Sequence, residues 1–206
     1  SIGLTAIISV FIGAVITLQM CINLDSPFIP RSLVGYATRE TMILEFSSAV
    51  VALILAGKVG SSIASEIGTM RITEQIDALV TLSTNPFKYL VAPRVLAGIM
   101  VLPLLVLIGD VIGIFGGFII AVYKLGFNPA NYINSTINGL ESLDIVTGVV
   151  KACVFGFIIA IMGCYNGYKS RGGAQGVGEA TTNAVVSASI LILIFNYIIT
   201  ELFFAK

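Results

Sequence analysis

Five long runs of apolar residues constrain the fold of this chain more than any other feature of its sequence. The runs cover about residues 2–24, 42–63, 95–123, 143–165 and 177–204. A membrane-crossing helix needs about 20 mostly apolar residues, whereas the strands of a membrane barrel alternate in segments of about ten residues. The sequence therefore predicts an all-α membrane protein with about five transmembrane helices, in a single domain over residues 1–206.

The composition excludes several classes of function. Charged residues make up 11% of the chain, against about 25% in soluble domains, and the zero net charge makes nucleic acid an unexpected partner. The chain has no histidine, so we expect neither zinc sites nor histidine-based catalysis. It also lacks P-loop, GxSxG, HExxH and DxxD motifs, and its serines and threonines have no histidine as base, so we expect no enzymatic chemistry, no metal and no cofactor on this chain. We interpret Cys21, Cys153 and Cys164 as small apolar packing residues.

Local signals mark the ends of the apolar runs. Pro27, Pro30 and Gly35 predict a break between the first two runs. Asn85 followed by Pro86 predicts a helix start, because asparagine caps helices and proline suits the first helical position. The glycine-rich stretch 172–178 predicts a flexible connection before the last run.

A polar stretch at residues 65–79 separates the second and third runs, and it carries Glu66, Arg71, Glu74 and Asp77. Basic residues favour the cytoplasmic side of a membrane. Six of the eleven lie in the two loops on the side of this stretch, and three lie in the opposite loops: Lys58, Arg71, Lys88, Arg94, Lys169 and Arg171 against Arg31, Arg39 and Lys124. This bias predicts a cytoplasmic polar stretch and a C-terminus on the outside.

The periodicity of residues 66–80 predicts one amphipathic helix. Ile72, Ile76, Leu79 and Val80 fall on one face, and the charged residues fall on the other. Such a helix can offer its charged face to a partner protein, or it can be a solvated loop helix without a partner. Amphipathicity alone does not decide between these two interpretations.

Three charged residues lie within or at the edge of apolar runs: Lys58, Asp110 and Lys151. A charge at the centre of a bilayer costs about 2.5–3.5 kcal/mol on insertion scales. We favour structural pairing of Asp110 with one of the lysines over a proton-coupled site. Glycines four residues apart predict close helix packing in two runs: Gly109, Gly113 and Gly117 in one, and Gly163 and Gly167 in the other.

Several sequence strings resemble the MlaE/YrbE permease family over essentially the whole chain. The most specific string is 56–79, which contains Glu-Ile-Gly-Thr-Met-Arg-Ile-Thr-Glu-Gln, and further matches lie at 10–13, 18–19, 85–86, 92–94, 102–104, 113–117, 151–155, 166–168 and 180–186. Two strings depart from the family pattern. Met20-Cys21 replace Gly-Tyr, and the segment 42–46 lacks the usual arginine and glycine, which affects the expected shape of the lipid site.

The resemblance implies the permease subunit of an ABC transporter that moves phospholipid between the inner and outer membranes of bacteria. It implies a multi-pass protein of the bacterial inner membrane that works as a homodimer. The implied partners are two cytoplasmic ABC ATPase subunits, which bind ATP and Mg, and a periplasmic MCE-domain protein. The resemblance also implies an interfacial helix before residue 1. Alternatives are a permease for another amphiphile, such as a sterol, a fatty acid or a drug-like compound, or a membrane scaffold without transport.

The resemblance further assigns roles to individual residues. The polar stretch would be the coupling helix that contacts the ATPase, through Glu66, Gly68, Thr69, Met70, Arg71, Thr73, Glu74 and Gln75. Candidates for the lipid path are Phe11, Leu18, Gln19, Glu45 and Phe195.

Overall fold

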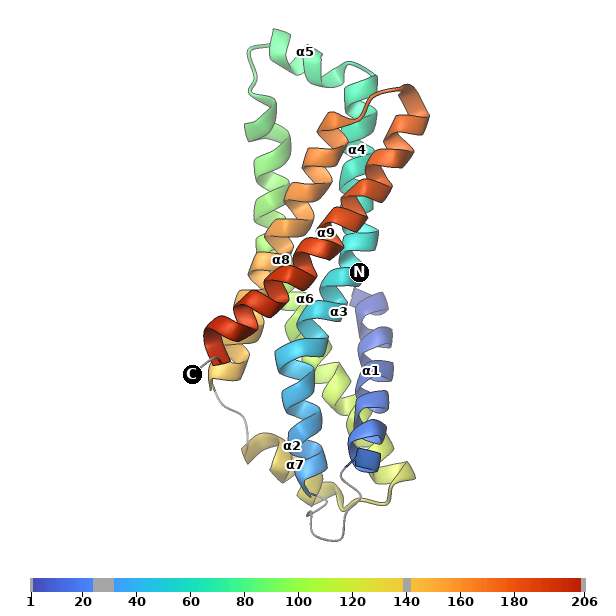
Figure 1. Cartoon of the computed structure of the whole chain (residues 1–206), viewed down its shortest axis with the longest axis vertical. Helices are drawn as coiled ribbons and strands as arrows, with labels where there is room; N and C mark the ends of the chain where they lie inside the picture. The colour runs from blue at the N-terminus through green and yellow to red at the C-terminus, as the bar shows by residue number, and fades with distance from the viewer. Residues whose placement is uncertain (1, 24–31, 139–141, 205–206) are drawn as a thin grey trace. The chain divides into compact units, whose positions relative to one another are not determined.

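The computed structural model describes residues 2–23, 32–138 and 142–204 (Figure 1). The helices are α1 (Ile2–Asn23), α2 (Ser32–Thr41), α3 (Ser47–Leu55), α4 (Ser61–Ile72), α5 (Gln75–Thr81), α6 (Ala92–Ile119), α7 (Pro129–Asn138), α8 (Ser142–Lys169) and α9 (Gly173–Phe204). Four π-helical turns continue them: η1 (Met42–Phe46), η2 (Ala56–Gly60), η3 (Phe87–Val91) and η4 (Ile120–Lys124).

Within the described part of the chain, five helical stretches are long and apolar enough to cross a membrane. They are Ile2–Asn23, Val34–Ile72, Phe87–Tyr123, Ser142–Lys169 and Gly173–Phe204. This confirms the predicted all-α membrane protein. The second and third stretches begin about eight residues before the predicted apolar runs, because α2 and η3 add helical turns before them.

The chain divides into two compact units, which are described separately. Unit 1 contains residues 1–51 and 104–150, and unit 2 contains residues 52–103 and 151–206. The boundaries fall inside α3, α6 and α8.

In unit 1, glycine allows α1 to approach α6 closely. A Cβ built on Gly13 would overlap the backbone of Gly113, and one built on Gly117 would overlap the hydroxyl of Thr17. A Cβ built on Gly113 would also overlap the end of the Met42 side chain. The predicted close packing at Gly109, Gly113 and Gly117 is therefore confirmed, since side chains at these positions would push the helices apart.

Two residues expected in the first loop lie instead in α2. Gly35 does not break the chain: it is buried in α2, and a Cβ there would lie 3.3 Å from the Tyr132 side chain of α7. Arg39 is 1% exposed, and its guanidinium lies 4.7 Å from the centroid of the Tyr36 ring. Arg39 is thus a buried helical residue and not a loop charge. Pro27, Pro30 and Arg31 lie outside the described residues.

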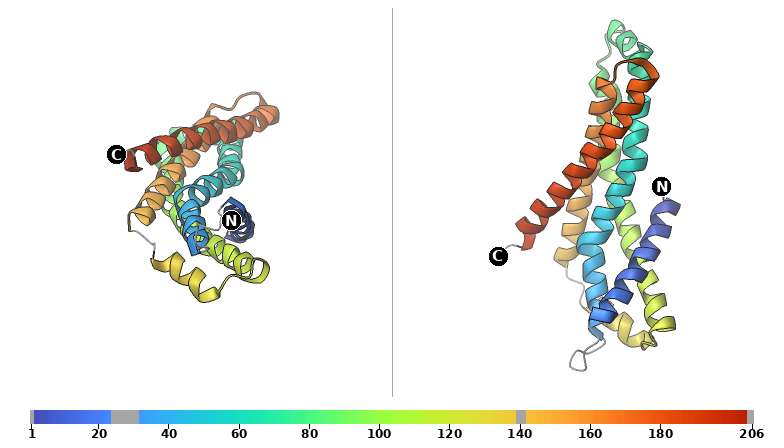
Figure 2. Two further views of the ribbon diagram at one scale, coloured as in Figure 1. Left: turned by 60° about the horizontal axis from the view of Figure 1, so that its bottom comes forward. Right: turned by 45° about the vertical axis from the view of Figure 1, so that its right-hand side comes forward.

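Unit 2 is held together by small residues on α8 and α9. A Cβ on Gly167 of α8 would lie 2.8 Å from the carbonyl oxygen of Ala64, and one on Gly163 would lie 3.0 Å from Ile63. The helix α9 runs along α4 (Figure 2). Its buried row has a spacing of three or four residues and consists of Val177, Ala180, Ala184, Ala188 and Ile192.

The helix starts match the local signals only in part. The side-chain oxygen of Asn85 accepts a hydrogen bond from the backbone N–H of Phe87 at 3.0 Å, as expected for a cap. The predicted flexible connection is wrong over 173–178, because α9 begins at Gly173. Gly172 and Gly173 adopt φ values of +89° and +71°, so the reversal between α8 and α9 is confined to this turn.

Candidate functional site

The polar stretch forms two helices joined by a sharp turn, which we call the elbow (Thr73–Glu74). The helix α4 ends at Ile72, and the Thr73 hydroxyl donates a hydrogen bond to the Thr69 carbonyl at 2.8 Å. Glu74 then takes a left-handed conformation with φ +59°, and α5 begins at Gln75. The single helix predicted over 66–80 is therefore wrong. Both elbow side chains are exposed, at the end of unit 2 that also holds α5 (Figure 1).

The apolar stripe does not form one face, because the chain turns inside it. Ile76 is fully buried and packs in a cluster with Ile63, Ile67, Leu90 and Cys164. Val80, in contrast, is 55% exposed. Burial of Ile76 anchors α5 against α4, so the elbow has a fixed position within unit 2.

Arg71 stabilises the elbow through contacts with other residues of unit 2. Its guanidinium forms an ion pair of 2.8 Å with Asp77, across the turn. It also lies 5.5 Å from the centroid of the Tyr168 ring, and that ring lies 5.3 Å from the Phe87 ring. The charge of Arg71 therefore has two intramolecular contacts, one with a carboxylate and one with an aromatic ring.

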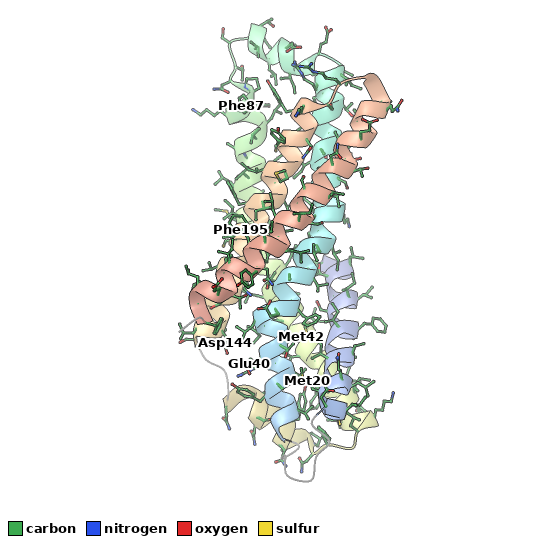
Figure 3. The ribbon with its side chains drawn as sticks, in the orientation of Figure 1. Met20, Glu40, Met42, Phe87, Asp144 and Phe195 are labelled. Atoms are coloured by element: carbon green, nitrogen blue, oxygen red, sulfur yellow. The ribbon has the colours of Figure 1, made fainter. Side chains whose placement is uncertain are left out.

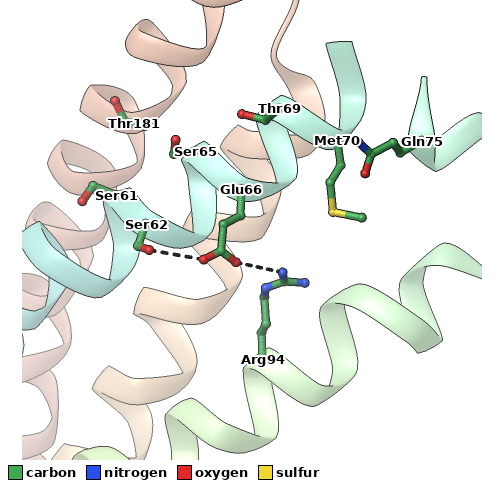
Figure 4. A pocket seen from close by; sticks show the side chains of 9 residues that line it. All are labelled: Ser61, Ser62, Ser65, Glu66, Thr69, Met70, Gln75, Arg94 and Thr181. Atoms are coloured by element: carbon green, nitrogen blue, oxygen red, sulfur yellow. Dashed lines mark hydrogen bonds and ion pairs between the residues drawn. The ribbon is translucent and has the colours of Figure 1, made fainter. Parts of the chain in front are cut away.

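A polar hollow of about 700 Å³ lies beside α4 (Figure 4). Its lining combines five hydroxyl groups with two opposite charges: Ser61, Ser62, Ser65, Glu66, Thr69, Met70, Gln75, Arg94 and Thr181. Arg94 and Glu66 form an ion pair of 3.0 Å, and Arg94 also donates to the Leu90 carbonyl at 2.9 Å. This ion pair joins α4 to the start of α6.

The structure brings half of the predicted coupling residues together. Glu66, Thr69, Met70 and Gln75 line the polar hollow. The others lie elsewhere: Gly68 is buried against Ser170 and Val177, Arg71 faces Asp77, and Thr73 and Glu74 form the elbow. Their contact with an ATPase stays a prediction.

Sequence reasoning missed Arg94, Thr181 and the three serines of the polar hollow. Ser61, Ser65 and Thr69 recur every four residues, and this spacing places them on one face of a helix. That spacing predicts a row of hydroxyl groups along one side of α4, which is the row that lines the hollow. Arg94 and Thr181 come from segments distant in the sequence, so no local pattern places them there.

The intramembrane charges differ in their surroundings. Asp110 is 7% exposed, lies within hydrogen-bonding reach of the Ser47 hydroxyl, and its Oδ1 atom has no hydrogen-bond partner. Ser47 also donates to the Val106 carbonyl at 3.1 Å. Lys151 is fully buried, whereas Lys58 is exposed. Because both lysines belong to unit 2 and Asp110 to unit 1, their pairing stays a prediction.

The predicted lipid-path residues lie in both units. Phe11 and Gln19 of α1 are exposed, whereas Leu18 and Glu45 are half-buried. Phe195 of α9 is 38% exposed (Figure 3). Their role in lipid transport stays a prediction.

Comparison with known proteins identifies the family. The sequence model described as Permease MlaE matches residues 1–202. The chain belongs to the MlaE permease family. Family membership makes it a permease, that is, a transport subunit in a membrane.

Similar proteins extend from bacteria to a plant. A probable ABC transporter permease protein of Rickettsia conorii is 54% identical over 204 residues, which cover 99% of this chain and 78% of that protein. One from Synechocystis is 39% identical, covering 99% and 77%. The chloroplastic protein TRIGALACTOSYLDIACYLGLYCEROL 1 of Arabidopsis thaliana is 34% identical, covering 99% and 58%. The chain is therefore an MlaE-family permease of the ABC transporter type.

Proposed function

We propose that this permease moves phospholipid between the inner and outer membranes of a bacterium, driven by two cytoplasmic ABC ATPase subunits. The observation that carries the proposal is the elbow with the adjoining polar hollow. Thr73, Glu74 and Gln75 are exposed at one end of unit 2, and α5 is anchored there by Ile76. An exposed and charged turn beside an anchored helix is suited to transmit the movement of a partner protein to this chain.

We expect the helix α4 to transmit this movement. On the side away from the elbow, it continues without a break into η2 and α3. A π-helical turn such as η2 contains one residue more per turn, and such turns are frequent at functional sites. We expect closure of the ATPases to press on the elbow and to shift α4 at η2. ATP and Mg would bind to the ATPases, and this chain would convert their motion into lipid movement.

Two observations support a lipid as cargo. An apolar groove of about 310 Å³ on unit 1 is large enough for a segment of an acyl chain. It is lined by Val111, Ile114, Phe115, Phe118, Tyr132, Ile133, Thr136 and Ile137. The Arabidopsis relative has a name that contains trigalactosyldiacylglycerol, a glycolipid with two acyl chains.

The proposal includes a homodimer in the bacterial inner membrane and a periplasmic MCE-domain protein that receives or delivers the lipid. The exposed apolar face of α9 supports a second copy as neighbour. Leu193 and Tyr197 on this face, in the C-terminal half of α9, are each more than half exposed. Two copies would enclose a lipid path to which Phe11, Leu18, Gln19, Glu45 and Phe195 contribute.

Charge reversal at the elbow tests the coupling. The variant Glu74→Lys/Gln75→Lys should lose at least about tenfold in recovery of the cognate ATPase, because a lysine pair would repel the surface that accepts an acidic elbow. The matched control is Asn134→Lys/Asn138→Lys on α7, which adds two lysines at exposed positions of unit 1. The measurement is ATPase co-purification at equal amounts of permease in the membrane. Unchanged recovery with the elbow variant would overturn the coupling assignment.

A further inference from the structure

A second polar pocket, which we call the basic pocket, lies where α8 turns into α9. It has a volume of about 310 Å³ and is lined by Tyr165, Asn166, Lys169, Ser170, Arg171, Gly176, Glu179, Ala180 and Asn183. The turn lies at the same end of unit 2 as α5 (Figure 1). None of these residues takes part in the elbow or the polar hollow.

Hydrogen bonds fix the walls of the basic pocket. The Asn166 amide nitrogen donates to the Met162 carbonyl at 2.9 Å and to the Ser187 hydroxyl of α9 at 3.3 Å. The Ser170 hydroxyl donates to the Gly68 carbonyl at 3.4 Å. Because α4, α8 and α9 are tied together here, the pocket exists before any ligand binds.

The charges of the basic pocket suit a single anionic group. Lys169 and Arg171 are both exposed and positive, and Glu179 is the one acidic residue in the lining. The Lys169 ammonium lies 5.7 Å from the centroid of the Tyr165 ring. A phosphate diester carries one negative charge, and arginine and lysine bind phosphate oxygens well.

The surroundings of the basic pocket favour a lipid over a soluble anion or an acidic protein segment. On α8, Ile161 and Phe157 precede Tyr165 at intervals of four residues, and each is more than a third exposed. On α9, Val186 and Ile190 follow Asn183 on the same side, and each is more than half exposed. Aromatic residues such as Tyr165 are enriched at the membrane interface. A polar pocket that opens onto two apolar helix faces matches a headgroup with its acyl chains.

We propose that the basic pocket binds the phosphate of an anionic phospholipid in the cytoplasmic leaflet. Its acyl chains lie along the exposed faces of α8 and α9, at Ile161 and Val186. The proposal rests on the predicted cytoplasmic orientation of this end of the chain. It does not rest on the transported cargo or on contact between the elbow and an ATPase.

Native mass spectrometry of the purified permease in detergent tests the proposal, with dioleoylphosphatidylglycerol as the anionic probe and dioleoylphosphatidylcholine as the zwitterionic probe. Attraction of one basic residue to an anionic lipid corresponds to about a fivefold change in affinity. Lys169→Gln/Arg171→Gln should therefore weaken phosphatidylglycerol binding by about 25-fold. Glu179→Gln should strengthen it by about fivefold, because it removes the acidic residue of the lining. Phosphatidylcholine binding should change little in either variant.

The matched control is Lys88→Gln/Lys124→Gln, which removes two exposed charges outside the pocket and should leave lipid binding unchanged. Equal binding of phosphatidylglycerol by the wild type and the double pocket variant would overturn the proposal. Full displacement of the lipid by millimolar inorganic phosphate would overturn it in favour of a small-anion site. Loss of ATPase co-purification with unchanged lipid binding would overturn it in favour of an acidic protein partner. Failure of the elbow test alone would leave the lipid result intact.

Discussion

Arg71 has two intramolecular partners, and these change its expected role. The ion pair with Asp77 closes the elbow, and the guanidinium also lies 5.5 Å from the centroid of the Tyr168 ring. The side chains of Arg71 and Asp77 are 34% and 60% exposed, so solvent screens the pair, and its contribution to stability is at most about 1 kcal/mol. We therefore infer that Arg71 helps to position α5, and its direct contact with an ATPase stays a prediction.

A charge swap separates these two roles. Arg71→Asp and Asp77→Arg alone should each lower ATPase co-purification several-fold, because each leaves two like charges across the elbow. The double variant Arg71→Asp/Asp77→Arg should recover most of the loss, because it restores an ion pair with reversed polarity. The measurement is ATPase recovery at equal permease level, with Lys88→Glu as a control for charge alone. If the double variant binds as poorly as Arg71→Asp, the charge of Arg71 acts on the partner directly.

At the scale of elements, contacts between small residues hold α4 and α8 together. Gly167 has the backbone of Ala64 as its neighbour, so a side chain at 167 has no space. Gly178 of α9 has nothing within 4 Å of a built Cβ. The same chemical change should therefore have opposite effects on stability at these two helical positions.

Gly167→Ala should destabilise unit 2 by about 1–3 kcal/mol, because the added methyl forces α8 away from α4. Gly178→Ala should leave stability unchanged or raise it by up to about 1 kcal/mol, because alanine favours the helix. The midpoint of thermal unfolding in detergent distinguishes the two. Equal midpoints would show that α8 does not pack against α4 through Gly167.

The elements also differ in how far their sequences predicted them. Long apolar runs and the Asn85 cap follow local rules, so the spans and the start of the third helical stretch were predictable. The elbow was not, because the turn contains no glycine or proline, and burial of Ile76 decides it. The helix α7 was also missed, although Asn128 caps its start by accepting a hydrogen bond from Ala130 N–H at 2.9 Å. Half of the coupling residues were found in the polar hollow, but its distant walls depend on tertiary packing.

At the scale of the whole molecule, the proposed function requires a membrane conduit and a point of attachment for the ATPases. Hydrophobic residues make up 57% of the sequence, and the polar features of unit 2 gather at the elbow, the polar hollow and the basic pocket. This division fits a transporter whose energy source is on another subunit. On the proposed function, the apolar surfaces that two copies enclose would set the chemical nature of the cargo.

The cargo is open to direct identification. Purification of the complete complex, followed by solvent extraction and mass spectrometry, should yield phospholipid enriched over the surrounding membrane. Narrowing of the apolar groove by Thr136→Phe should lower this enrichment several-fold, while Asn138→Phe, exposed on the same helix, should not. Enrichment of a sterol, a fatty acid or another amphiphile instead would replace phospholipid as the cargo.

Because Glu74 has a left-handed backbone conformation, stability and activity favour different residues at this position. Residues with a side chain lose about 1 kcal/mol in this conformation, and glycine does not. Glu74→Gly should therefore raise the thermal midpoint, and it should weaken ATPase recruitment because the carboxylate is gone. Directed evolution for expression or heat resistance would select this substitution early, whereas selection for transport would remove it. Glycine at position 74 would thus give a permease that is more stable and less active in transport.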